Sequence, residues 1–385
     1  MQFMQATDPL GIVTWFAMLF IFMYIYPRMM LSQLISKIDQ SARKIEAMSE
    51  KANGLVLKKS GNHGTKHAIH EFTELFVVEP SAIDPYGLVK KIDQTIRNME
   101  QRFNEFARSI AKNKGELETQ EINYGLRAAV SLRQMAKIVR HYVEISKKFK
   151  NLQIAMILQM QLPIIEKIAE SELRGTEAFV NGWPIGDSIG PLVAATYMKK
   201  PRSIAEEVVA DETSINGRTC FVLKAAGPAP HLGRINDAIE KIMKKHRISR
   251  VVTIDAGTKL EGEKTGTVAE GVGFAMGGVG QREMIENALL PRNIPIDSII
   301  IKVGMDEAIL PMKKSIFESV EKAKGYVEKS VNRAARGQKL IIIGVGNSCG
   351  VGDSYKAYDE VKGVVEELHK QYKKEEKEAK KGGWF

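Results

Sequence analysis

Acidic side chains gather after two short apolar segments in the second half of the chain. Asp255 ends one apolar run and is soon followed by two glutamates, and Asp353 follows the run 339–345. Carboxylate oxygens hold hard divalent cations, and a bound cation can activate water. The alternative is that the glutamates are solvated and pair with the neighbouring Lys259 and Lys264. The predicted metal ligands are Asp255, Glu261, Glu263 and Asp353.

Glycines and basic residues in the same segments indicate a second kind of site, for phosphate or a nucleotide. Glycine lets backbone N–H groups approach an anion closely, and a basic side chain adds charge. Residues 263–266 resemble the end of a P-loop, but the full order of that motif is absent. Residues 344–350 resemble a dinucleotide-binding turn, but the sequence has no following strand to supply the ribose carboxylate. The predicted ligand-binding residues are Gly227, His231, Arg234, Lys264, Gly344, Gly346 and Asn347.

A nucleophilic serine is the third interpretation. Residues 346–350 match the G-x-S-x-G pattern, which places Ser348 on the turn after a strand. A triad would need a downstream acid, Asp353 or Asp359, and His369 as the base. His369 falls in a charged helical tail, which argues against this arrangement. The predicted catalytic residues are Asp255, Ser348 and Asp353.

All three interpretations need a sheet that brings these segments together. Continuous apolar runs at 250–255, 298–303 and 339–345 predict strands buried on both faces. Helical patterns at 235–246, 282–290 and 314–336 separate them, and Asn216-Gly217 predicts a hairpin between strands at 205–211 and 218–226. The fold class is therefore α/β, with a mostly parallel C-terminal sheet. Because parallel strands end at one edge, the loops after 251–255 and 340–345 should meet there.

The first part of the chain predicts a membrane anchor. Residues 10–26 carry no charge and reach spanning length with their flanks, and Lys and Arg residues follow from Arg28 onward. The positive-inside rule then puts the N-terminus outside and the remainder in the cytoplasm, with a single pass through the cell membrane. A second apolar stretch at 152–168 contains three glutamines and Pro163, so it predicts a buried helix or a subunit interface.

Domain boundaries follow from these patterns. An amphipathic helix continues from the anchor until Asn53-Gly54, a strand is expected at 71–78, and long helices are expected at 86–110 and 118–149. His63, His67 and His70 have a spacing that could hold a metal on a helix, but nearby glycines favour a loop. The predicted parts are an anchor (1–30), a juxtamembrane helix and linker (31–84), a helical region (85–174), an α/β domain (175–353) and a charged C-terminal helix and tail (354–385).

Composition sets wider limits on the function. The chain has 385 residues, 44% of them hydrophobic, so it can form a real core. Its two cysteines predict neither a disulfide framework nor a zinc site. The net charge of +10 favours acidic surfaces such as anionic lipid, although most of it is spread over solvated helix faces. No motif or basic-aromatic stripe indicates nucleic-acid binding.

The loops Glu-Gly-Glu-Lys-Thr-Gly and Gly-Val-Gly-Asn, with the anchor and the helical region, resemble an archaeal family of membrane-anchored proteins of unknown function. That resemblance covers nearly the whole chain and implies no activity. The Gly-x-Gly-Asn turn also resembles the opening of the hydrogenase-maturation and germination protease fold, and residues 186–191 (GDSIGP) are similar to its Asp-x-x-Gly-Pro piece. Here the two pieces lie far apart and in reverse order, so we expect a shared turn rather than common descent.

Two functions fit these observations. The first is an α/β head on a membrane stalk that binds a small anionic or metal-containing ligand and could act as a hydrolase, with a divalent cation as the candidate cofactor. The second is a non-enzymatic, membrane-tethered scaffold, favoured by the long helices and the apolar stretch at 152–168. In both cases we expect the bilayer to hold residues 10–26 and the protein to form a homo-oligomer.

Overall fold

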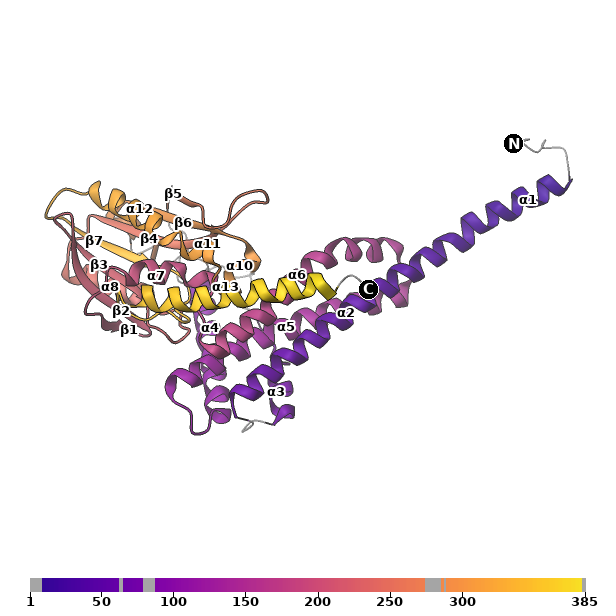
Figure 1. The fold of residues 1–385 in the computed structure, drawn as a ribbon, viewed down its shortest axis with the longest axis horizontal. Helices are drawn as coiled ribbons and strands as arrows, with labels where there is room; N and C mark the ends of the chain where they lie inside the picture. Colours follow the sequence, from indigo (N-terminus) through magenta and orange to yellow (C-terminus); the bar gives the residue numbers. More distant parts are fainter. Residues whose placement is uncertain (1–8, 62–64, 79–86, 274–284, 287–288, 383–385) are drawn as a thin grey trace. The chain divides into compact units, whose positions relative to one another are not determined.

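The computed structural model describes residues 9–61, 65–78, 87–273, 285–286 and 289–382. The chain forms two compact units, and each is described by itself. The first unit contains the residues up to Lys51 together with Ser131–Glu170, and the second contains Ala52–Val130 and the residues from Ser171 onward. Figure 1 shows the elements along the chain.

The apolar N-terminal segment is helical and continues without a break into the next helix. The elements are α1 (Pro9–Phe20), a π-helical turn (Ile21–Ile25) and α2 (Tyr26–Lys59). Pro27 has no backbone N–H to donate. The N–H of the preceding residue, Tyr26, donates to the carbonyl of Ile21, five residues earlier, as in a π-helix. By length and composition, this helix and the later α6 could each cross a membrane.

In the helical region, α2 is longer than expected, and residues 71–78 do not form the expected strand. α2 passes through Asn53-Gly54, because Ala52 and Val56 are fully buried and their packing outweighs the cost of a helical glycine, about 1 kcal/mol. The predicted break there is wrong. The remaining helices of this region are α3 (Lys66–Phe72), α4 (Leu88–Ile110), α5 (Glu116–Phe149) and α6 (Leu152–Asn181).

The strand predicted at 71–78 is also wrong. Thr65 caps α3 by accepting a hydrogen bond from the N–H of Ala68, and Phe72 stacks on Phe106 of α4 with ring centroids 4.0 Å apart. Phe72, the first apolar residue of the predicted strand, is therefore the last residue of α3, and it packs against α4. Of the three spaced histidines, His63 lies outside the described residues, and His67 lies 3.3 Å from Glu71 on the surface of α3.

A seven-stranded mixed sheet forms the centre of the second unit, in the order β1-β2-β3-β7-β4-β6-β5. β3, β7, β4 and β6 are parallel, and the outer strands pair antiparallel. The hairpin at Asn216-Gly217 joins β2 to β3 as predicted, whereas β1 and β5 were not foreseen. The strands are β1 (Arg202–Ala205), β2 (Val208–Ile215), β3 (Arg218–Ala225), β4 (Arg250–Thr258), β5 (Val268–Val272), β6 (Ile296–Val303) and β7 (Lys339–Gly344).

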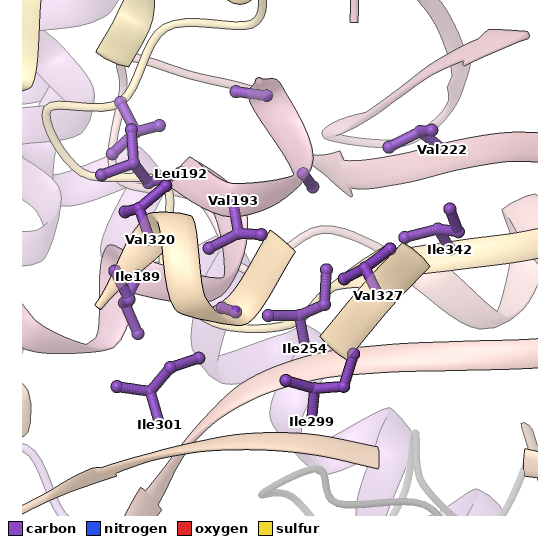
Figure 2. Packing of buried hydrophobic residues seen from close by; sticks show 14 of the residues in the cluster. Ile189, Leu192, Val193, Val222, Ile254, Ile299, Ile301, Val320, Val327 and Ile342 are labelled. Atoms are coloured by element: carbon purple, nitrogen blue, oxygen red, sulfur yellow. The ribbon is translucent and has the colours of Figure 1, made fainter. Parts of the chain in front are cut away.

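Helices cover both faces of the sheet, which confirms the α/β class. On one face, α7 and α12 place Ile189, Val193 and Val327 against strand residues such as Ile254 and Ile342 (Figure 2). On the other face, α8 buries one apolar stripe against β3, β4 and β7. The helices are α7 (Ile189–Ala195), α8 (Ile235–Lys245), α10 (Met305–Ile309), α11 (Lys314–Phe317), α12 (Val320–Asn332) and α13 (Ala357–Gly382).

The predicted helix at 314–336 is divided into α11 and α12. Most of the helix predicted at 282–290 lies outside the described residues. A short 3-10 turn, η2 (Gly186–Ser188), precedes α7 and becomes important at the site.

Candidate functional site

The carboxyl ends of the four parallel strands lie along one edge of the sheet. β7 and β4 are direct neighbours, so the two loops that the sequence places together do start side by side. The N–H of Val345, the first residue after β7, donates to the carbonyl of Ile254 at 2.8 Å. β4 continues past the end of β7, which leaves Asp255 beside the start of the β7 loop.

The segment before α7 also reaches this edge. A Cβ on Gly346 would lie 2.1 Å from the carbonyl oxygen of Asp187, and a Cβ on Gly190 would lie 2.1 Å from that of Val345. Gly346 has φ 125°, which side-chain-bearing residues rarely adopt. Only glycine allows these backbones to approach so closely. The GDSIGP and Gly-Val-Gly-Asn segments, far apart in sequence, are therefore in direct contact.

Asp187 is held in place by the loop after β7. The backbone N–H of Asn347 donates to Asp187 Oδ2 at 2.8 Å, and the side-chain oxygen of Asn347 accepts from the N–H of Cys349 at 2.9 Å. Ser188, next in the chain, donates to the carbonyl of Cys349 at 3.0 Å. These bonds fix the orientation of the Asp187 carboxylate, while the residue keeps partial access to solvent.

Burial raises the pKa of both Asp187 and Asp255, and the charge of Asp187 adds to the shift of Asp255. Burial, and then the nearby charge of Asp187, raise the pKa of Asp255 to about 8. Burial also raises the pKa of Asp187, and the N–H of Asn347 only partly opposes that shift. Two carboxylates in one enclosed place cannot both ionise cheaply, so the pair holds a proton near neutral pH. Such a pair can give and take protons in one reaction.

Asp353 forms an ion pair with a buried lysine. Its Oδ1 accepts from Lys224 Nζ at 2.6 Å and from the N–H of Gly227 at 2.7 Å. Lys224, on β3, is fully buried, and burial lowers its pKa while Asp353 opposes that shift. The Asp353 carboxylate therefore balances a buried ammonium group.

Ser348 joins two loops. Its Oγ accepts from the N–H of His231 at 3.1 Å and lies 2.6 Å from the carbonyl of Ala226 and 2.8 Å from that of Ala229. The residue is fully buried. These contacts fix the β3 loop on the β7 loop, and in the described residues no histidine side chain hydrogen bonds to the hydroxyl.

The basic residues predicted to bind a ligand divide into paired and exposed ones. His231 Nδ1 lies 3.0 Å from Glu207 Oε1, and Arg234 forms ion pairs with Asp93 at 3.2 Å and with Glu100. Lys264 is exposed. Gly227, Gly346 and Asn347 lie at the contacts between the β3 loop, the β7 loop and the segment before α7, and Gly344 at the end of β7 packs against α7.

The four predicted metal ligands are spread along the edge. Glu263 forms an ion pair with Lys302 and accepts from the N–H of Leu260 at 2.8 Å, while Glu261 is exposed. Across the described ranges, no three Asp, Glu, His or Cys side chains are close enough to hold a metal ion. A cation at Asp255 would take its second carboxylate from Asp187, not from the predicted set.

A buried glutamate that the sequence analysis did not select organises the loop after β4. Glu307, on α10, lies 2.9 Å from Lys313 Nζ and accepts from Thr265 and from the N–H of Gly304 at 2.8 and 2.7 Å. Burial would raise its pKa, but these donors outweigh it and lower the pKa to about 2. Glu307 is thus a fixed anion that ties this loop to α10. Its carbonyl would be 2.1 Å from a Cβ on Gly186, so it also supports η2.

Asp187 is a site residue that the sequence patterns do not predict. The one indication in the sequence is the similarity of residues 186–191 to an Asp-x-x-Gly-Pro piece, whose order relative to the Gly-x-Gly-Asn turn is reversed. Which residues become neighbours in space depends on the order of the strands in the sheet. β7 follows the other strands in sequence but lies in the middle of the sheet.

The fold and site define a class: an α/β protein with a long apolar N-terminal helix and a carboxyl pair at the carboxyl edge of its sheet. Two family models match nearly the whole chain. The model for the protein of unknown function DUF1512, N-terminal domain, matches residues 12–182, and the model for the DUF1512 C-terminal domain of unknown function matches residues 185–352. The chain belongs to the DUF1512 family. Neither the curated proteins nor the solved structures gave a match.

Proposed function

We propose that the α/β part is a hydrolase in which Asp187 and Asp255 form the acid–base pair. The observation that carries this proposal is the position of Asp187, which the N–H of Asn347 holds at the loop where Asp255 also lies, and burial there raises the pKa of both carboxyl groups. Perturbed carboxyl pairs of this kind are typical of acid–base catalysis. Three other carboxylates of this edge, Asp353, Glu263 and Glu307, each form an ion pair with a lysine.

The pair supports hydrolysis of an amide bond. The ionised carboxylate takes a proton from water, and the resulting hydroxide attacks the carbonyl carbon. The protonated carboxyl gives its proton to the departing nitrogen, so the products are a carboxylic acid and an amine and the pair regains its single proton. An amide bond suits this pair, because an amine is a poor leaving group until its nitrogen is protonated and the neutral carboxyl can supply that proton.

The test uses the full-length protein in detergent micelles and a mixed peptide library read by mass spectrometry. Asp187→Asn and Asp255→Asn should each lower cleavage at least 100-fold, and Glu263→Gln, which removes a surface ion pair, should retain it. Wild-type cleavage should fall as the pH rises through about 8, because the shared proton is lost. Cleavage that persists in both Asn variants, or no cleavage of any peptide, would overturn the proposal.

The same proposal includes membrane attachment. The long apolar N-terminal helix supports an anchor over residues 10–26, and the basic residues that begin at Arg28 support a cytoplasmic location for the catalytic part. The substrate would then be a cytoplasmic peptide or a segment of a membrane protein near the bilayer.

A further inference from the structure

Ion pairs within the first unit fix the register of α5 and α6 against α2. Arg140 on α5 pairs with Asp39 and, at 2.7 Å, with Glu46, while Lys147 lies 3.0 Å from Asp39. α5 therefore runs antiparallel to α2. Lys44 on α2 contacts both Glu166 and Glu170 on α6 at 2.9 Å, which gives offsets of 122 and 126 residues, and α6 runs parallel to α2.

This register places the turn between α5 and α6 near the end of the apolar segment. With the offset of 122, Leu152 lies level with Met30 and Met156 lies level with Leu34. With the offset of 126, Met160 lies level with Leu34. A spanning helix of about 20 residues that starts at Leu10 ends near Met30. At about 1.5 Å per residue, Met156 is then only about 6 Å beyond the hydrocarbon core, within the headgroup layer.

The side chains at this level suit a bilayer surface. Ala155, Leu158 and Leu162 are buried on one side of α6, whereas the other side exposes a second apolar stripe. In water such a stripe is costly, and a helix that is apolar on both sides is typical of a buried or lipid-contacting position. The exposed apolar residues on α6 are Met156, Ile157, Met160 and Ile164, and Phe149 at the end of α5 is exposed beside them in sequence.

Basic residues accompany the exposed aromatic ring. Lys148 Nζ lies 5.5 Å from the ring centroid of Phe149, and Lys150 follows directly. Neither lysine forms an ion pair with a described residue, in contrast to Lys147. Lysines next to exposed aromatic and aliphatic side chains are the usual composition of a segment that lies in an anionic membrane interface.

We propose that the tip of the α5–α6 hairpin, residues 148–160, inserts into the anionic headgroup layer beside the anchor. The bilayer is favoured over a second copy of the chain because the exposed apolar residues from Phe149 to Met160 lie near the depth of the membrane surface and are accompanied by unpaired lysines. The hairpin would then give the protein a second membrane contact and prevent rotation about a single helix. The inference rests on the proposed anchor and is independent of the hydrolase chemistry.

The test measures depth with a fluorescent label on single new cysteines in the full-length chain, reconstituted in vesicles that contain anionic lipid and brominated quencher lipid. Cys220 and Cys349 are fully buried, so the label reports the new site. Phe149→Cys and Met156→Cys should be quenched several-fold more than the matched control Ile138→Cys. That control is equally exposed on α5, but its register places it about 24 Å beyond Met30.

Two further measurements distinguish a failure of the anchor proposal from a failure of the hairpin proposal. Met18→Cys on α1 tests the anchor: if Met18 is quenched and Met156 is not, only the hairpin proposal is overturned. Crosslinking of Met156→Cys between two chains without lipid quenching would overturn it too, because a second copy would then cover the stripe. Lys148→Glu combined with Lys150→Glu should reduce the quenching at Met156→Cys in anionic vesicles and have less effect in neutral ones. An equal effect in both would contradict the proposed role of the lysines.

Discussion

Replacing Asp255 by asparagine should stabilise the α/β part at neutral pH. The carboxyl has a pKa of about 8 in the folded protein and 3.8 as its ordinary value. Because the folded pKa is raised, its contribution to stability is complete below pH 4 and is lost as the pH rises towards 8. The loss amounts to about 1.4 kcal/mol per pH unit, or about 4 kcal/mol at pH 7. Asparagine has the shape of the neutral acid and does not titrate.

The assay is thermal unfolding of full-length wild type and Asp255→Asn in the same micelles from pH 4.5 to 8.5. The variant should exceed the wild type by about 1 kcal/mol at pH 4.5 and by about 4 kcal/mol at pH 7. For a unit of this size that is a difference in melting temperature of about 8–16 °C at pH 7. The control Glu263→Gln should show no such gain, since its ion pair with Lys302 lowers the pKa of Glu263.

A variant that is no more stable than the wild type at pH 7, or a difference that does not change with pH, would refute this reasoning. Asp255 would then be ionised in the folded protein and balanced by a bound cation. Adding a divalent cation should in that case stabilise the wild type and not the variant, which would move the site from acid–base to cation chemistry.

Three other predictions follow from the same geometry. Asp353→Asn should destabilise the protein by about 3–5 kcal/mol, because it leaves Lys224 buried and unpaired, and adding Lys224→Met should recover most of the loss in denaturant titrations. Gly346→Ala should lower the free energy of unfolding by several kcal/mol in the same titrations, because its Cβ would clash with Asp187 and its φ is 125°. The control Gly363→Ala, in open space on α13, should change that free energy by at most about 1 kcal/mol. A reporter fused after the last residue should be cytoplasmic, and protease digestion of it from outside intact cells would contradict the topology.

The α/β class and the central strands were predictable because their information is local. Runs such as Leu340–Ile343 are apolar without interruption, and only a strand covered on both faces can bury every side chain of such a run. β1 and β5 are short, partly exposed edge strands, and their side chains do not show a clear alternation. The helical break at Asn53 failed for the opposite reason, because long-range packing of α2 outweighed a local preference.

The candidate site was predictable only in part, since its chemistry depends on which side chains remain without a balancing partner. Sequence places Asp255 and Asp353 equally well at the ends of neighbouring strands. In the structure, Asp353 balances Lys224, while Asp255 is subject to the charge of another carboxyl group, Asp187, 68 residues earlier in the chain. The two residues therefore differ in the chemistry open to them, although nothing in their local sequence distinguishes them. The order of the strands in the sheet determines which group lies near each carboxylate. A role can therefore be assigned to either carboxylate only when the sheet topology is known, because the local motif does not identify its neighbour.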